Sequence, residues 1–145
     1  MNHSGKEDNQ PSGFLGKYSI TLLRLALGIT YVWFGALKLA GKSPIEDMVR
    51  KTSLFLPEDS AVPIMGTLEV AIGAGLLTRT ALKFTLLLFF GQVVSTFLFL
   101  VLRPRETFQK GNPMLLTERG EFIMKNLVLL SAGVAIASTA GREKK

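Results

Sequence analysis

Four long apolar runs, separated by short charged gaps, constrain this chain more than any other feature of its sequence. They cover about residues 18–40, 62–77, 81–102 and 122–139. A helix that rises ~1.5 Å per residue crosses a hydrocarbon core of ~30 Å in about 20 residues. Lipid offers no partner to backbone polar groups, so runs of this length form helices. The sequence therefore predicts an all-α membrane protein with an antiparallel four-helix transmembrane bundle.

The gaps between these runs set the topology. The second run is short for a span, and we expect Pro63 in its first helical turn and Arg79 reaching outward at its far end. Residues 78–80 leave room only for a tight turn, so the second and third spans are antiparallel neighbours. Four spans place both termini on one side and the connections 41–61 and 103–121 on the other.

The remaining segments are polar. Residues 1–16 are predicted to be a disordered tail, residues 17–141 the transmembrane domain, and residues 142–145 a basic tail. The connection 41–61 fits either a short interfacial helix or an amphipathic loop, because apolar residues alternate there with charges (Ile45, Met48, Val49 and Phe55). The stretch RPRETFQKG, which starts at Arg103, is expected to be a solvated loop at the level of the lipid headgroups.

Charge and composition exclude several classes of function. The chain has no cysteine and its single histidine is His3, so disulfides, thiolate metal sites, iron–sulfur clusters and a haem between helix histidines are excluded. The net charge of +6 lies mostly in the gaps, which favours anionic lipid headgroups over nucleic acid as its partner. The two sides of the predicted bundle carry equal numbers of basic residues, counting Lys and Arg together. The shorter turn on the side of the termini favours cytoplasmic termini. We predict no metal site, no covalently bound cofactor and no catalytic residue.

Polar residues recur inside the spans at helical spacing. In the first span, Arg24, Tyr31 and Lys38 share one face with two glycines, and a face of small and ionisable residues points to protein. The other spans have similar faces. The predicted interior residues are Arg24, Tyr31, Lys38, Glu69, Gln92, Lys125 and Asn126, and the predicted packing glycines are Gly28, Gly35, Gly66 and Gly73.

Glu69 is the one acid within these four runs. A charge near the bilayer centre costs ~3 kcal/mol or more, so this carboxylate needs a cation. We expect Arg24 to be that cation, because a guanidinium binds a carboxylate through two hydrogen bonds, with Lys38 or Lys125 completing a network. The cluster is either a lock that fixes helix packing or the wall of a site for a small polar molecule, a quinone headgroup or a proton path. In the second case, Glu69→Gln spares assembly and abolishes activity.

Three stretches resemble a known family. LLRLALGITYVWFGALKLAG, PIMGTLEVAIGAGLLTRTA and GEFIMKNLVLLSAG are similar to the DoxX/DoxD-like family of small four-helix bacterial membrane proteins. The positions that match its pattern are Arg24, Gly35, Lys38, Glu69, Gly73 and Arg79. The resemblance implies a multi-pass protein of the bacterial inner membrane, linked in some relatives to quinone oxidoreductases or redox stress. Lys125 and Asn126 depart from the quinol-oxidase subunits.

Three functions remain open on this basis. The first is a membrane accessory protein or subunit of a respiratory or redox-protective system, not catalytic alone, that contacts a quinone and a redox-enzyme partner. The second is a small transporter or proton-coupled permease that acts as a homo-oligomer, because four helices seldom enclose a pathway. The third is a membrane subunit of a quinone oxidoreductase whose partner supplies the redox centre.

Overall fold

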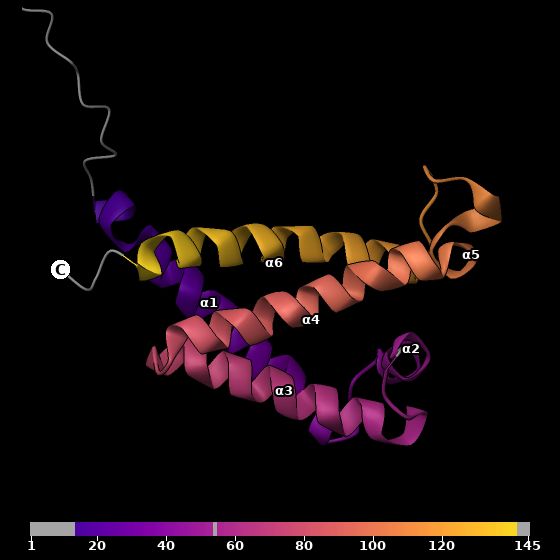
Figure 1. Ribbon diagram of the computed structural model, residues 1–145, viewed down its shortest axis with the longest axis horizontal. Helices are drawn as coiled ribbons and strands as arrows, with labels where there is room; N and C mark the ends of the chain where they lie inside the picture. The colour runs from indigo at the N-terminus through magenta and orange to yellow at the C-terminus, as the bar shows by residue number, and fades with distance from the viewer. Residues whose placement is uncertain (1–13, 54, 142–145) are drawn as a thin grey trace, which may run out of the picture.

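Four long helices form the body of the protein in the computed structural model, which describes residues 14–53 and 55–141 (Figure 1). They are α1 (Phe14–Leu39), α3 (Glu58–Thr78), α4 (Leu82–Leu102) and α6 (Glu118–Ala140). Each is long and apolar enough to cross a bilayer. The chain is thus a multi-pass membrane protein, and the predicted antiparallel four-helix bundle is confirmed.

The topology also agrees with the prediction. The start of α1, the turn between α3 and α4 and the end of α6 lie at one end of the bundle (Figure 1). The opposite end carries two short helices, α2 (Glu46–Thr52) and α5 (Pro104–Thr107), and a 3-10 turn, η1 (Gln109–Gly111). Most of the predicted tails, residues 1–13 and 142–145, lie outside the described residues.

Three of the four long helices, α1, α3 and α6, are longer than the apolar runs that predicted them, and α4 agrees with its run to within one residue. The first helix begins at Phe14, within the predicted tail, and α3 begins at Glu58, so Pro63 is its sixth residue and the prediction of a first-turn position was wrong. For α3 and α6 the reason is that a charged first turn outside the hydrocarbon core is still helical. In α6 this extension has a cap, because the Thr117 hydroxyl accepts a hydrogen bond of 3.2 Å from the Gly120 N–H.

Two glycine pairs bring α1 and α3 into backbone contact. A Cβ on Gly35 would lie 2.6 Å from the Gly66 carbonyl oxygen, and one on Gly73 would lie 2.7 Å from the Gly28 carbonyl oxygen. Within each helix the two glycines are seven residues apart, which is about two turns, so both pairs lie on the same seam. All four predicted packing glycines therefore lie at this interface, which is the most extensive contact between helices.

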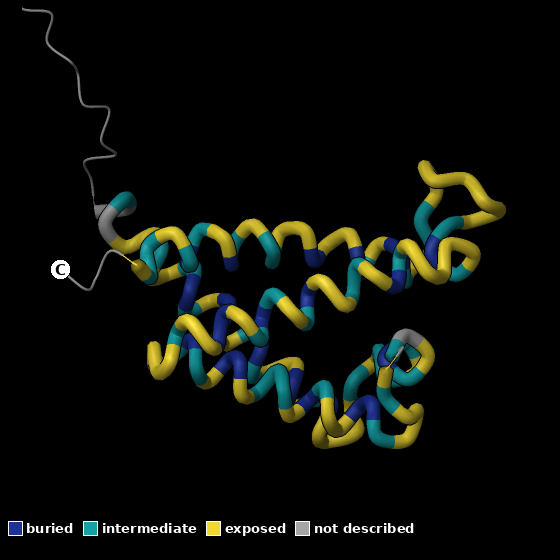
Figure 2. Tube along the Cα trace, in the orientation of Figure 1, coloured by how far each residue is buried: buried dark blue, intermediate teal, exposed yellow. Residues whose placement is uncertain are grey.

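Large apolar side chains cover the outside of the bundle, as expected in lipid. Buried positions face inward along the long helices, and exposed ones follow their outer sides (Figure 2). Trp33 and Val128 are examples, at 65% and 72% exposure. The buried core includes Tyr31 and Phe89, whose ring centroids are 5.4 Å apart.

Candidate binding site within the bundle

A buried ion pair joins the first two spans. Lys38, in the last turn of α1, places its Nζ 2.6 Å from Glu69 Oε2 in the middle of α3. The two side chains are only 4% and 13% exposed. Gly66, one turn before Glu69, has no side chain to obstruct Lys38, and a Cβ there would lie 3.0 Å from the Lys38 Cβ. The packing seam thus also gives the lysine access to its carboxylate.

Gln92 of α4 extends this pair across the bundle. Its Nε2 donates a hydrogen bond of 3.1 Å to Glu69 Oε1, so each carboxylate oxygen accepts one bond. The other end of the amide, Gln92 Oε1, is buried and accepts no hydrogen bond from the part of the chain that the structure describes. Glu69 therefore sits at the centre of a three-residue cluster contributed by α1, α3 and α4, hereafter the Lys38–Glu69–Gln92 cluster.

The prediction that Arg24 pairs with Glu69 is wrong. Arg24 Nη1 donates to the Leu77 carbonyl oxygen at 3.2 Å and also to the Leu76 carbonyl oxygen, which are in the last turn of α3. Arg24 precedes Lys38 by 14 residues, or about 21 Å along the helix axis, so in an antiparallel pair it faces the other end of α3. There it satisfies carbonyls that have no partner within the helix and complements the negative end of the helix dipole.

The two predicted residues of α6 occupy different positions. Lys125 is exposed, and its Nζ lies 3.9 Å from Glu121 Oε2, whereas the cation paired with Glu69 is Lys38. Asn126 is buried, at 9% exposure. Lys125, Asn126 and the Lys38–Glu69–Gln92 cluster are nevertheless all part of the lining of one cavity.

This cavity has a volume of about 440 Å³ and lies among α1, α3, α4, α6 and α2. Small-molecule pockets typically enclose roughly 300–1,000 Å³, so its size suits a small ligand. Its walls are mainly apolar, with Val93, Phe99 and Ile123 buried. Phe34 and Phe55 also line it and are 48% and 78% exposed, so the cavity opens to the surface.

The short helix α2 forms part of this lining. Its Met48 and Val49 face the cavity, together with Ile45 just before it and Leu56 just after it. Val49 also packs against Ala61 and Val62 at the start of α3. The alternation of apolar and charged residues in this connection therefore reflects a helix, and that helix is packed on the bundle.

Several lining residues were not predicted as site residues. Phe99 lies two turns beyond Gln92 on α4, and Ile123 lies one turn before Asn126 on α6. Positions three, four or seven residues away from Gln92 and Asn126 lie on the same helix faces, so helical spacing would have identified these residues. They look like ordinary span residues in sequence, and their role depends on the empty space beside them.

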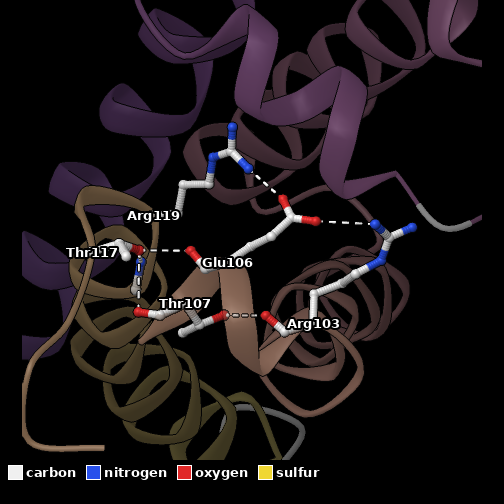
Figure 3. A network of polar contacts seen from close by, with 6 residues as sticks. Arg103, Glu106, Thr107, Thr117 and Arg119 are labelled. Carbon is white, nitrogen blue, oxygen red and sulfur yellow. Dashed lines mark hydrogen bonds and ion pairs between the residues drawn. The ribbon is translucent and has the colours of Figure 1, made fainter. Parts of the chain in front are cut away.

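The segment after α4 is more ordered than a solvated loop. Glu106 accepts a hydrogen bond of 3.0 Å from Arg103 and a second one from Arg119 of α6 (Figure 3). The Thr117 hydroxyl donates to the Glu106 carbonyl oxygen at 2.8 Å. Buried Thr107 fits beside Gly120, which has no side chain. Arg105 and Lys110 are exposed, as expected at headgroup level, but the prediction of a plain loop was wrong.

Searches against models of protein families, curated proteins and solved structures found no match to this chain. The DoxX-like resemblance is consequently an expectation from short motifs. The described residues contain no group of three or more His, Cys, Asp or Glu side chains that could hold a metal ion. What the arrangement offers chemically is a mainly apolar cavity with a compact polar wall.

Proposed function

We propose that this protein is a membrane-embedded accessory protein that binds a lipid-soluble small molecule with a polar headgroup. A quinone is the leading candidate, and a respiratory or redox-protective system of the bacterial inner membrane is the proposed setting. The observation that carries this proposal is the cavity of about 440 Å³ whose apolar walls meet the Lys38–Glu69–Gln92 cluster.

The charges at the site favour a neutral headgroup. The positive charge of Lys38 is already neutralised by Glu69 at 2.6 Å, so the Lys38–Glu69–Gln92 cluster has no net charge that would attract an anion. A phosphate or carboxylate placed there would be desolvated without a cation of its own, which costs several kcal/mol. Lys125 at the edge of the cavity lies within 3.9 Å of Glu121. Anionic lipid headgroups are therefore poor candidates for this cavity.

The lining suits a flat ring attached to an apolar tail. Four phenylalanines line the cavity and provide faces for an aromatic or quinoid ring, namely Phe34, Phe55, Phe99 and Phe122. A polar headgroup at the Lys38–Glu69–Gln92 cluster would have hydrogen-bond partners, and a tail could leave past the exposed Phe34. The DoxX-like resemblance points to the same ligand class and to a redox-enzyme partner that carries out any electron transfer.

Binding of a short-chain quinone to the purified full chain in lipid nanodiscs tests this proposal. We expect saturable binding, corrected for partition into the lipid, that weakens at least about tenfold in Glu69→Gln, because Glu69 holds Lys38 and Gln92 at the wall. Glu121→Gln, an exposed glutamate on the same membrane half, is the matched control and should bind like wild type.

A second variant separates binding from assembly. Thr96→Phe fills part of the cavity without removing a member of the Lys38–Glu69–Gln92 cluster, and it should also lose binding. Size-exclusion profile and helical circular dichroism show whether each variant is folded. The proposal is overturned if wild type shows no saturable binding, or if a folded Thr96→Phe binds as tightly as wild type.

A further inference from the structure

The serine and threonine hydroxyls of the cavity lining already donate their protons within the chain. The hydroxyls of Thr30, Ser95 and Thr96 all donate to backbone carbonyls of their own helices, at 2.8, 2.6 and 3.1 Å. Ser53 does the same toward the Val49 carbonyl oxygen at 2.8 Å. Each hydroxyl has one proton and two lone pairs, so each has only acceptor capacity left for a ligand.

Gln92 adds a buried acceptor that has no partner among the described residues. Its Nε2 is directed to Glu69 Oε1 at 3.1 Å, which fixes the amide, because the flipped orientation would set a carbonyl oxygen against a carboxylate. Its Oε1 is thereby left as the free end, buried and unpaired, on a residue that lines the cavity. A buried acceptor without a hydrogen bond is costly, and a donor brought by a ligand would remove that cost.

From these groups we infer that the bound headgroup donates a hydrogen bond, so that the site prefers the reduced, hydroquinone form of its ligand over the quinone. This inference rests on the proposed function. A hydroquinone hydroxyl donates to Gln92 Oε1 and can also accept from Lys38, Tyr31 or Asn126. A quinone carbonyl only accepts, so it leaves Gln92 Oε1 unpaired. The inference concerns binding alone.

Anaerobic titration of the full chain in nanodiscs tests the preference with three probes of one ring system. These are a short-chain quinone, its hydroquinone and the dimethyl ether of that hydroquinone. We expect the hydroquinone to bind about tenfold or more tightly than the other two, since a ligand that leaves a buried acceptor unpaired loses about that factor. The ether keeps the ring and loses both donors, so it should resemble the quinone.

Gln92→Met is the variant that tests the residue, because methionine has a similar length and no amide oxygen. The ratio between hydroquinone and quinone affinities should fall to near one in this variant. Gln109→Met, on an exposed residue of η1, is the matched control and should keep the wild-type ratio. The ether comparison needs only wild type, so it stands even if Gln92→Met does not fold.

The outcomes separate this inference from the proposed function. If wild type binds quinone, hydroquinone and ether equally, the preference is refuted and quinone binding stands. If none of the three binds saturably, the proposed function fails and the preference with it. If a folded Gln92→Met retains the preference, the assignment to Gln92 is refuted.

Discussion

Gly35→Ala is expected to separate α1 from α3. The new Cβ would lie 2.6 Å from the Gly66 carbonyl oxygen and 2.8 Å from both the backbone nitrogen and Cγ2 of Val70. Two of these three atoms belong to the backbone of a helix and cannot turn away as a side chain does. The helices must therefore move apart by about 0.8 Å to restore ordinary contact, or else tilt around the seam.

The cost of that movement follows from the size of the interface. In a membrane, helices associate largely through close van der Waals packing, and a gap of 0.5–1 Å forfeits roughly a quarter to a half of each atom contact. The α1–α3 interface is the most extensive in the protein. Added methyl groups in tight interiors cost about 1–3 kcal/mol, and we expect Gly35→Ala to reach the upper part of that range.

Reversible unfolding of the purified protein in mixed detergent micelles measures this loss. The matched control is Gly91→Ala on α4, because a Cβ there meets nothing within 4 Å. Alanine favours a helix over glycine by about 0.5–1 kcal/mol, so the control should be as stable as wild type or more stable. Equal stability of Gly35→Ala and Gly91→Ala would refute the account of a glycine seam.

Three further changes test other contacts. Lys38→Met should lower the free energy of unfolding by about 3–5 kcal/mol, because it leaves the Glu69 carboxylate buried without its cation. Adding Glu69→Leu to the same chain should recover most of this stability. Unfolding in detergent measures both variants, and a double variant as unstable as Lys38→Met would contradict the buried pair. Arg24→Gln should lower stability by about 1–3 kcal/mol and speed amide exchange in the last turn of α3, whereas unchanged exchange would argue against the contact with Leu76. Thr117→Ala should cost about 1 kcal/mol and expose residues 103–117 to protease, and an unaltered cleavage pattern would show that this cap does not hold the segment.

Much of the architecture could be read from the sequence because lipid leaves a spanning segment few choices. Run length and the lack of backbone partners in lipid determine the spans. Helical spacing identified the interior face of α1, and the residues on it that the structure buries include Gly28, Gly35 and Lys38. Helix ends were less predictable, because charged first turns such as the one at Glu58 are helical without being apolar.

The partner of Glu69 could not be read in the same way. The sequence offered three candidate cations, Arg24, Lys38 and Lys125, and we expected Arg24 because a guanidinium can bind a carboxylate through two hydrogen bonds. The antiparallel register of α1 and α3 determines which cation pairs with Glu69. The glycine seam places Lys38 beside Glu69 and Arg24 at the end of α3. Register depends on contacts between two helices, which the pattern within one helix does not contain.

The cavity and the ordered segment after α4 depend on packing in a similar way. The free acceptor of Gln92 exists because its amide is directed to Glu69, a choice that only the relative position of α3 and α4 determines. The structure of residues 103–117 depends on Arg119 and Gly120, which belong to the next span. The sequence of residues 103–117 resembles that of a loop because the residues that hold this segment in place belong to another helix.

The glycine seam also bears on how the chain is made. Both glycine pairs and the Lys38–Glu69 ion pair lie within residues 28–73, which precede α4 and α6 in the chain and are synthesised before them. The first two helices thus carry what they need to form a hairpin and to neutralise their own buried charges during insertion. Such a hairpin enters the bilayer without a bare carboxylate, and the later helices arrive at a partner that is already in place.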